Sequence, residues 1–254
     1  MEVHTHTHTP RKKWTHYLWE FLMLFLAVFC GFLAENIREN SVERHRERDY
    51  IKLLIEDLHA DTAIIHHAIP ILQQYVRGLD TLIAETYANL EEKSDRRLMY
   101  YAYHHYCRTS FGVVISQRAM NQLKNSGNMR LIRNKQALEI ILGIEVSFQQ
   151  FDAQTNFLNP LQKDPSGFGM KIFDFKEYQK AKGDPGGDVN IGEEGFRKIN
   201  YQPVLNNTDP GILKEFAARV GYYRNSLSSY IFYLAGANQG FEKDINNLNK
   251  IYQF

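Results

Sequence analysis

Residues 51–83 read IKLLIEDLHADTAIIHHAIPILQQYVRGLDTLI, a stretch in which apolar side chains recur in alternating steps of four and three. This is the heptad spacing of packed helices. Additional apolar residues widen the stripe, which favours a helical bundle over a two-stranded coil. Pro70 either kinks this helix or starts a new one. We assign an oligomer or bundle face to five residues of the stripe: Ile51, Ile55, Leu58, Ile65 and Ile69.

The chain after this stretch predicts further helices and almost no strand. The predicted helices cover residues 94–107, which are rich in tyrosine, 116–125, 134–158 and 210–252. Asn159-Pro160 is expected to end the third of them, and Asp209-Pro210 supplies a cap and a first-turn proline to the last. Residues 160–208 hold many glycines and prolines, which predicts a long irregular loop. The expected fold is all-α, an up-and-down helical bundle over residues 51–254 that contains this loop.

The chain before the stretch predicts a membrane anchor. Residues 21–34 (FLMLFLAVFCGFLA) carry no charge, and Trp14, Tyr17 and Trp19 precede them as an aromatic belt does at a membrane surface. A transmembrane helix is therefore expected over residues 14–36. A cleaved signal peptide and a buried soluble helix are the alternatives, although no clear cleavage site follows the apolar run.

Two polar segments flank the expected span. Residues 37–50 interleave arginines with glutamates, and the glutamates recur every four residues from Glu35, which predicts a solvated helical stalk. Residues 1–13 form a polar tail that is rich in histidine. The basic cluster at residues 11–13 favours a cytoplasmic N-terminus, and hence a main domain on the other side of the membrane.

Residues 1–36 (MEVHTHTHTPRKKWTHYLWEFLMLFLAVFCGFLAEN) resemble a family of small, single-span, membrane-anchored helical proteins from Bacteroidota-type bacteria. Residues 125–134 (NSGNMRLIRN) are similar to a motif in the middle of the same proteins. The resemblance implies a bacterial inner-membrane protein with one span and a helical domain, expected in the periplasm. The family has no established activity to carry over, so the resemblance implies no catalytic residue.

Several polar residues are candidates for a site. Glu20 and Glu35 are intramembrane polar candidates, and Glu20 lies either inside the span or in the headgroup layer. His4, His6 and His8 alternate with threonine and form a candidate metal site, with a disordered tail as the alternative.

Three other patterns are weaker. Glu56-x-x-His59 has the spacing of a di-iron ligand pair but occurs once, so the acidic residues around it are expected on a solvated face. The pairs His66-His67 and His104-His105 approach one another if their helices are antiparallel neighbours, and partly buried imidazoles are the alternative. The run GDPGGDVN at 183–190 is expected to be a turn-rich loop.

The composition excludes several classes of function. Thirty basic and 29 acidic residues give a formal charge of +1, which argues against a nucleic-acid binder. Two cysteines provide no disulfide framework, and no catalytic motif or cofactor fingerprint is present. We therefore expect a non-enzymatic, membrane-anchored interaction or scaffold protein without a cofactor, which self-associates or binds another membrane protein. The alternative is an oligomeric, ion-conducting or proton-coupled assembly that uses Glu20.

Overall fold

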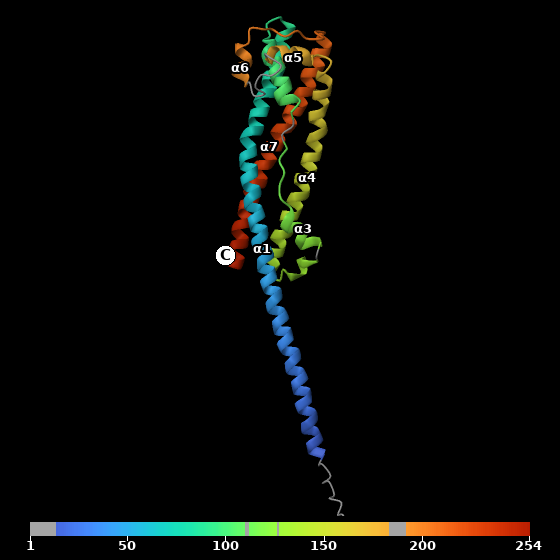
Figure 1. Cartoon of the computed structure of the whole chain (residues 1–254), viewed down its shortest axis with the longest axis vertical. Helices are drawn as coiled ribbons and strands as arrows, with labels where there is room; N and C mark the ends of the chain where they lie inside the picture. The colour runs from blue at the N-terminus through green and yellow to red at the C-terminus, as the bar shows by residue number, and fades with distance from the viewer. Residues whose placement is uncertain (1–13, 110–111, 126, 183–191) are drawn as a thin grey trace, which may run out of the picture. The chain divides into compact units, whose positions relative to one another are not determined.

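The computed structural model describes residues 14–109, 112–125, 127–182 and 192–254. Over these residues it contains seven α-helices, one π-helix and one 3-10 helix, and no strand (Figure 1). This confirms the predicted all-α class. The chain divides into two compact units, residues 1–51 and residues 52–254, and we describe each by itself.

The first helix, α1 (Trp14–Leu90), is continuous over 77 residues and contributes to both units. The segments predicted as span, stalk and first bundle helix therefore belong to one helix. Pro70 lies inside α1 and does not start a new helix, although it cannot donate a backbone hydrogen bond to the preceding turn. Where the predicted span and stalk meet, Arg38 Nε donates to Glu35 Oε2 at 3.0 Å, in agreement with the three-residue spacing.

The second unit is built around α7 (Pro210–Tyr252), which packs against α4 (Lys135–Gly169) and lies beside α1 (Figure 1). Phe148 and Thr155 of α4 contact Phe241 and Tyr230 of α7, respectively, so these two helices are antiparallel.

Helices α1 and α7 are antiparallel as well. The Arg224 guanidinium donates to the Asp80 carboxylate at 2.8 Å, and the Lys52 ammonium lies 5.2 Å from the ring centre of Phe254. The long helices bury the heptad positions between them, as the sequence pattern predicts.

The chain returns along the bundle between α1 and α4. Helix α2 (Arg96–Ala102) leads directly into a π-helix at Tyr103–Cys107, and residues 112–117 then run without regular structure to α3 (Arg118–Asn125). A 3-10 helix at Asn128–Leu131 connects α3 to α4. Ser116 N–H donates to Asp61 Oδ1. Between the end of α1 at Leu90 and Ser116, the chain has therefore passed back along about 40 Å of α1.

Three of the predicted helix starts are confirmed by their caps. Asp95 Oδ1 accepts from the N–H of the second residue of α2 at 3.1 Å. Asn134 Oδ1 accepts from Ala137 N–H at 3.0 Å, and Asp209 Oδ1 accepts from Ile212 N–H at 2.9 Å. Each cap satisfies a backbone donor that the first turn of a helix leaves unpaired.

The long irregular loop expected at residues 160–208 is in large part helical. Helix α4 continues through Pro160 and Pro165 to Gly169, and α5 (Phe175–Lys182) and α6 (Glu193–Lys198) follow. Packing maintains the end of α4, because Pro165 is buried and Gln162 Nε2 donates to Cys107 O at 2.9 Å. The run at 183–190 lies outside the described residues.

Candidate functional site

The apolar part of α1 is exposed along its whole length in the first unit. Its best 18-residue window has a mean hydropathy of 2.0, and none of it is buried. Phe21, Phe25 and Phe29 stack along one side of the helix, with ring centres 6.4 and 5.9 Å apart. This segment is long and apolar enough to cross a membrane, a test that a signal sequence also passes.

The two intramembrane candidates both lie beside a partner on their own helix. Glu20 Oε1 is 3.1 Å from His16 Nε2 one turn earlier, and both side chains are about half exposed. Glu35 accepts hydrogen bonds from Arg38, whose Nε lies 3.0 Å from Glu35 Oε2.

The predicted oligomer or bundle face is a buried surface of the single chain. Ile51, Ile55, Leu58 and Ile65 are buried, and Ile69 is partly exposed. These side chains therefore supply core packing, and an oligomer has to use another surface. His4, His6 and His8 lie outside the described residues.

The expectation of a solvated acidic face on α1 is wrong for two of its members. Asp57 accepts hydrogen bonds from Ala119 N–H and from Arg118 Nη2, both at 2.8 Å, and it thereby caps the start of α3. Asp61 is fully buried, and only one of its carboxylate oxygens has a hydrogen-bond partner. Burial is the largest cause of the raised pKa of Asp61, about 6, and the nearby charge of Asp57 adds to it.

The histidine pairs do not form a common site. His66 and His67 are exposed on α1, whereas the π-helix packs against α1 farther along, near Tyr75. His105 stacks on Tyr101 with ring centres 5.1 Å apart. Within the described ranges, no group of three histidine, cysteine or acidic residues is placed to hold a metal ion.

The π-helix is the centre of an aromatic cluster. Its Tyr106 ring occupies the space beside Gly78 of α1, where a Cβ atom would come within 2.0 Å of the ring. Its Tyr103 ring occupies the space beside Gly169 at the end of α4, where a Cβ would come within 2.2 Å, and Tyr103 also stacks on Phe173 with centres 4.1 Å apart. Single π-turns inside helices occur frequently at functional sites.

His104 is the buried polar residue of this cluster. Its ring stacks on Tyr178 with centres 3.7 Å apart, and its Nδ1 lies 3.3 Å from Arg108 Nη1. Burial, with a contribution from the Arg108 charge, lowers the pKa of His104 to about 3, so the ring is neutral at physiological pH.

A neutral imidazole ring carries one N–H proton, either on Nδ1 or on Nε2. A guanidinium only donates, so Nδ1 accepts from Arg108 and Nε2 of His104 carries the proton. This Nε2 is buried without a hydrogen-bond partner. A buried donor left unpaired costs about 1–3 kcal/mol.

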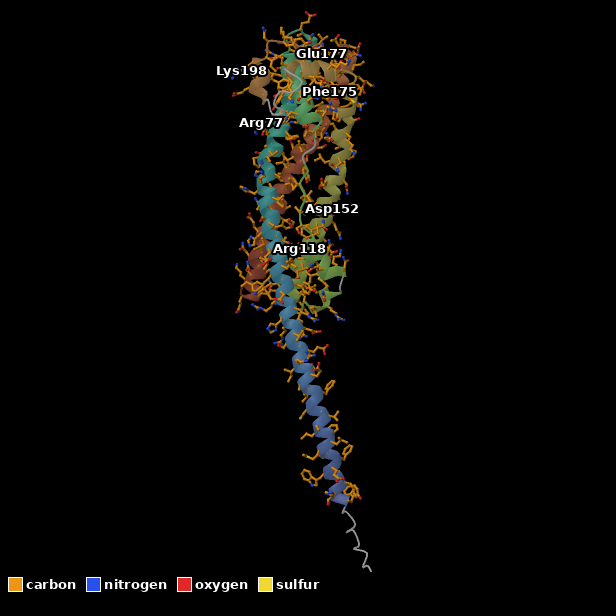
Figure 2. The ribbon with its side chains drawn as sticks, viewed as in Figure 1. Arg77, Arg118, Asp152, Phe175, Glu177 and Lys198 are labelled. Atoms are coloured by element: carbon orange, nitrogen blue, oxygen red, sulfur yellow. The ribbon has the colours of Figure 1, made fainter. Side chains whose placement is uncertain are left out.

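A cavity of about 430 Å³ adjoins this ring. One arginine, one aspartate and an asparagine line it together with aromatic and thioether side chains; the lining residues are Tyr103, His104, Arg108, Met170, Phe173, Asp174, Phe175 and Asn206. Figure 2 labels Phe175, one of these lining residues, at the end of the second unit where α5 and α6 lie. Cavities of this size are typical of small-molecule sites.

Glu177 of α5 anchors the chain that borders the cavity. It accepts from Tyr201 Oη at 2.5 Å and from Val204 N–H at 3.0 Å. The hydrogen bond from Lys180, followed by these two, lowers the pKa of Glu177 to about 2. Asn206 then donates its backbone N–H to Ile172 O at 2.8 Å, which places it at the cavity.

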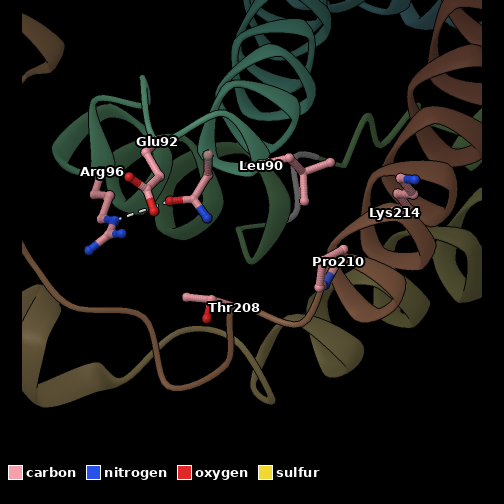
Figure 3. Close-up of a pocket in the computed structure, with 7 residues that line it drawn as sticks. Leu90, Glu92, Arg96, Thr208, Pro210 and Lys214 are labelled. Carbon is pink, nitrogen blue, oxygen red and sulfur yellow. Dashed lines mark hydrogen bonds between the residues drawn. The ribbon is translucent and has the colours of Figure 1, made fainter.

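A second cavity, of about 330 Å³, lies where α1 ends and α7 begins (Figure 3). Arg96 and Glu92 are on one side of it, and Pro210 and Lys214 on the other. Arg96 Nε donates to Asn89 Oδ1 at 3.1 Å, so this guanidinium is already engaged by the protein. The first cavity, with an unpartnered imidazole donor, is the better candidate for a ligand site.

Sequence reasoning identified the tyrosine-rich run at residues 100–106 but neither the π-turn nor the cavity. The one available signal was the His104-His105 pair within that run. Comparisons of the chain with protein-family models, with curated proteins and with solved structures find no match.

Proposed function

We propose that this protein is a single-span, non-enzymatic anchor of the bacterial inner membrane that presents its helical domain, residues 52–254, to a partner. The observation that carries the proposal is the exposure of the whole apolar part of α1. Four phenylalanines, four leucines and one valine lie within residues 21–34. On an insertion scale such residues together favour the membrane by about 3–5 kcal/mol.

The polar neighbours of this segment support a headgroup position for its N-terminal end. Glu20 and His16 form a pair one turn apart; Trp14 precedes this pair in the sequence, and Tyr17 and Trp19 lie between its two members. Tryptophan and tyrosine favour the membrane–water interface, where a polar pair stays hydrated. The bilayer is thus the first partner of the chain, and the resemblance of residues 1–36 to anchored bacterial proteins points the same way.

Self-association in this proposal uses surfaces that the fold leaves exposed, because the heptad face is buried. Among the described residues of the second unit, Phe232 on α7 is the most exposed large apolar side chain, at 83%. Phe232→Ser is expected to weaken crosslinking of copies in the membrane and to leave the helical content unchanged. Tyr222→Ser, at another exposed position of α7, is the matched control. A strictly monomeric wild type at all concentrations would remove self-association from the proposal.

The deciding experiment concerns retention in the membrane. The full chain is expected to remain in the membrane fraction after alkaline extraction and to keep residues 14–34, as shown by its intact mass. Phe25→Lys combined with Phe29→Lys is expected to release it, whereas Val42→Lys, in the stalk, is not. An extracted protein shortened after residue 34 would identify a signal peptide and overturn the anchor. Reporter fusions to the C-terminus would test the periplasmic side.

The alternative function, an ion-conducting or proton-coupled assembly, depends on Glu20 inside the bilayer. Its distinguishing result is proton or cation flux through the reconstituted wild type that Glu20→Gln abolishes. Absence of flux in the wild type would leave the anchor as the proposal.

A further inference from the structure

We propose that the cavity beside the π-helix binds a small zwitterion, namely an α-amino acid with an apolar side chain, because Arg108, Asp174 and an aromatic wall line one cavity. This inference goes beyond the anchoring function and does not depend on it. Each of the three features matches one part of such a ligand.

The first feature is the guanidinium of Arg108. Its one hydrogen bond to the described chain goes to His104 Nδ1, and this acceptor is uncharged. Arg108 is exposed and forms no ion pair with any described acidic residue, so its positive charge is not neutralised by the protein. A guanidinium in this state is suited to hold a carboxylate by paired hydrogen bonds.

The second feature is the carboxylate of Asp174. One of its oxygens accepts from Lys176 N–H at 2.8 Å, which caps the start of α5 and leaves the negative charge in place. A purely anionic ligand would be repelled by Asp174, and a purely cationic one by Arg108. A ligand that carries an ammonium and a carboxylate satisfies both charges.

The third feature is the apolar wall. Phe173 is buried behind the cavity, whereas Met170 and Phe175 border it with large exposed areas. An apolar side chain of the ligand would cover this surface. His104 lines the same cavity, and its buried Nε2–H has no hydrogen-bond partner among the described residues. A cavity of about 430 Å³ has room for a single amino acid of moderate size.

The test is titration calorimetry with the full chain in lipid nanodiscs. The probes are L-phenylalanine, 3-phenylpropionate, which lacks the ammonium, and phenethylamine, which lacks the carboxylate. L-phenylalanine is expected to bind, and each of the other two to bind at least about tenfold more weakly. L-leucine is expected to bind as well, because the wall is apolar and not shaped for one ring.

The variants examine the two charges separately. Arg108→Gln and Asp174→Asn are each expected to weaken L-phenylalanine binding at least about tenfold, and asparagine retains the helix cap. Arg77→Gln, an exposed arginine of α1, is the matched control and is expected to bind as the wild type does. No binding of any probe at about 10 mM would overturn the proposal. The proposal would also be overturned if 3-phenylpropionate bound as tightly as L-phenylalanine, or if both charge variants left the binding of L-phenylalanine unchanged.

Discussion

Replacement of Asp61 by asparagine is expected to stabilise the protein. Asparagine keeps the oxygen that accepts from Ser116 N–H and removes a charge that is fully buried. Burial raises the pKa of Asp61 from 3.8 to about 6. At a pH above both values, this rise corresponds to about 3 kcal/mol of folding free energy that the ionised carboxylate costs. We therefore expect a gain of about 1–3 kcal/mol for Asp61→Asn at pH 7.5.

The pH dependence of this gain is the sharper signature. The folded state holds the Asp61 proton more tightly than the unfolded state, so the stability contributed by this group is present at low pH. It is lost as the pH rises through the window from 3.8 to about 6. The advantage of Asp61→Asn is accordingly expected to be about 1.4 kcal/mol smaller at pH 5 than at pH 7.5.

The measurement is urea unfolding of the full chain in neutral detergent micelles, followed by far-UV circular dichroism. His104 contributes in the opposite sense, because its folded pKa of about 3 lies below its unfolded value of 6.5. Stability from His104 is lost as the pH falls through that window. The test therefore uses the difference between variant and wild type at each pH, in which this contribution cancels.

Asp57→Asn is the matched control for Asp61→Asn. Asp57 accepts from Ala119 N–H and pairs with Arg118, so loss of these interactions is expected to cost about 1–2 kcal/mol at pH 7.5, where Asp61→Asn is expected to stabilise. If Asp61→Asn is less stable than the wild type at pH 7.5, or if its advantage does not change with pH, the reasoning from burial is wrong.

Three other predictions concern glycine, cysteine and histidine residues. Gly78→Ala, which would place a Cβ within 2.0 Å of a tyrosine ring, is expected to cost more than about 2 kcal/mol in urea unfolding. Gly143→Ala on α4, whose added Cβ would meet nothing within 4 Å, is expected to raise the free energy of unfolding by about 0.5–1 kcal/mol. Equal effects of the two substitutions on this free energy would show that the contact between Gly78 and the tyrosine ring is not rigid. Burial raises the pKa of Cys107 to about 12, so a membrane-impermeant maleimide is expected to label it only after unfolding. The same reagent is expected to miss Cys30 in intact membranes, and its reaction there would contradict the span. The imidazole NMR signals of His104 are expected to stay those of a neutral ring down to about pH 4, and a titration near pH 6.5 would show an open site.

The sequence predicts the helices of this fold well where two signals agree. Asn134 and Asp209 combine a capping side chain with an apolar pattern that follows, and both begin helices as expected. Pro160 does not end α4, because the packing of the last turns, where Gln162 and Pro165 are buried, offsets the cost of a proline inside the helix. A proline is thus a poor predictor of a helix end where the residues on both sides of it make tertiary contacts.

The candidate site is less predictable than the fold. Asp57 and Asp61 are expected on a solvated face, because Glu56-x-x-His59 occurs only once and nothing local shows that Ser116 and α3, distant in sequence, cover them. The cavity likewise joins Arg108 to Asp174, which come from segments 66 residues apart. Such a site depends on tertiary packing, which the period of a single helix does not encode.

The two glycine contacts of the π-helix restrict how this region responds to a ligand. Tyr103 fits against Gly169 and Tyr106 against Gly78, and the two rings engage different long helices. A return of the π-turn to α-helical winding would rotate the residues after it by about 100° and withdraw at least one ring from its position. The backbone around His104 is therefore held in register from two sides. We therefore expect the proposed ligand to be accommodated by rotation of the exposed side chains of Met170 and Phe175, while the main chain stays in place.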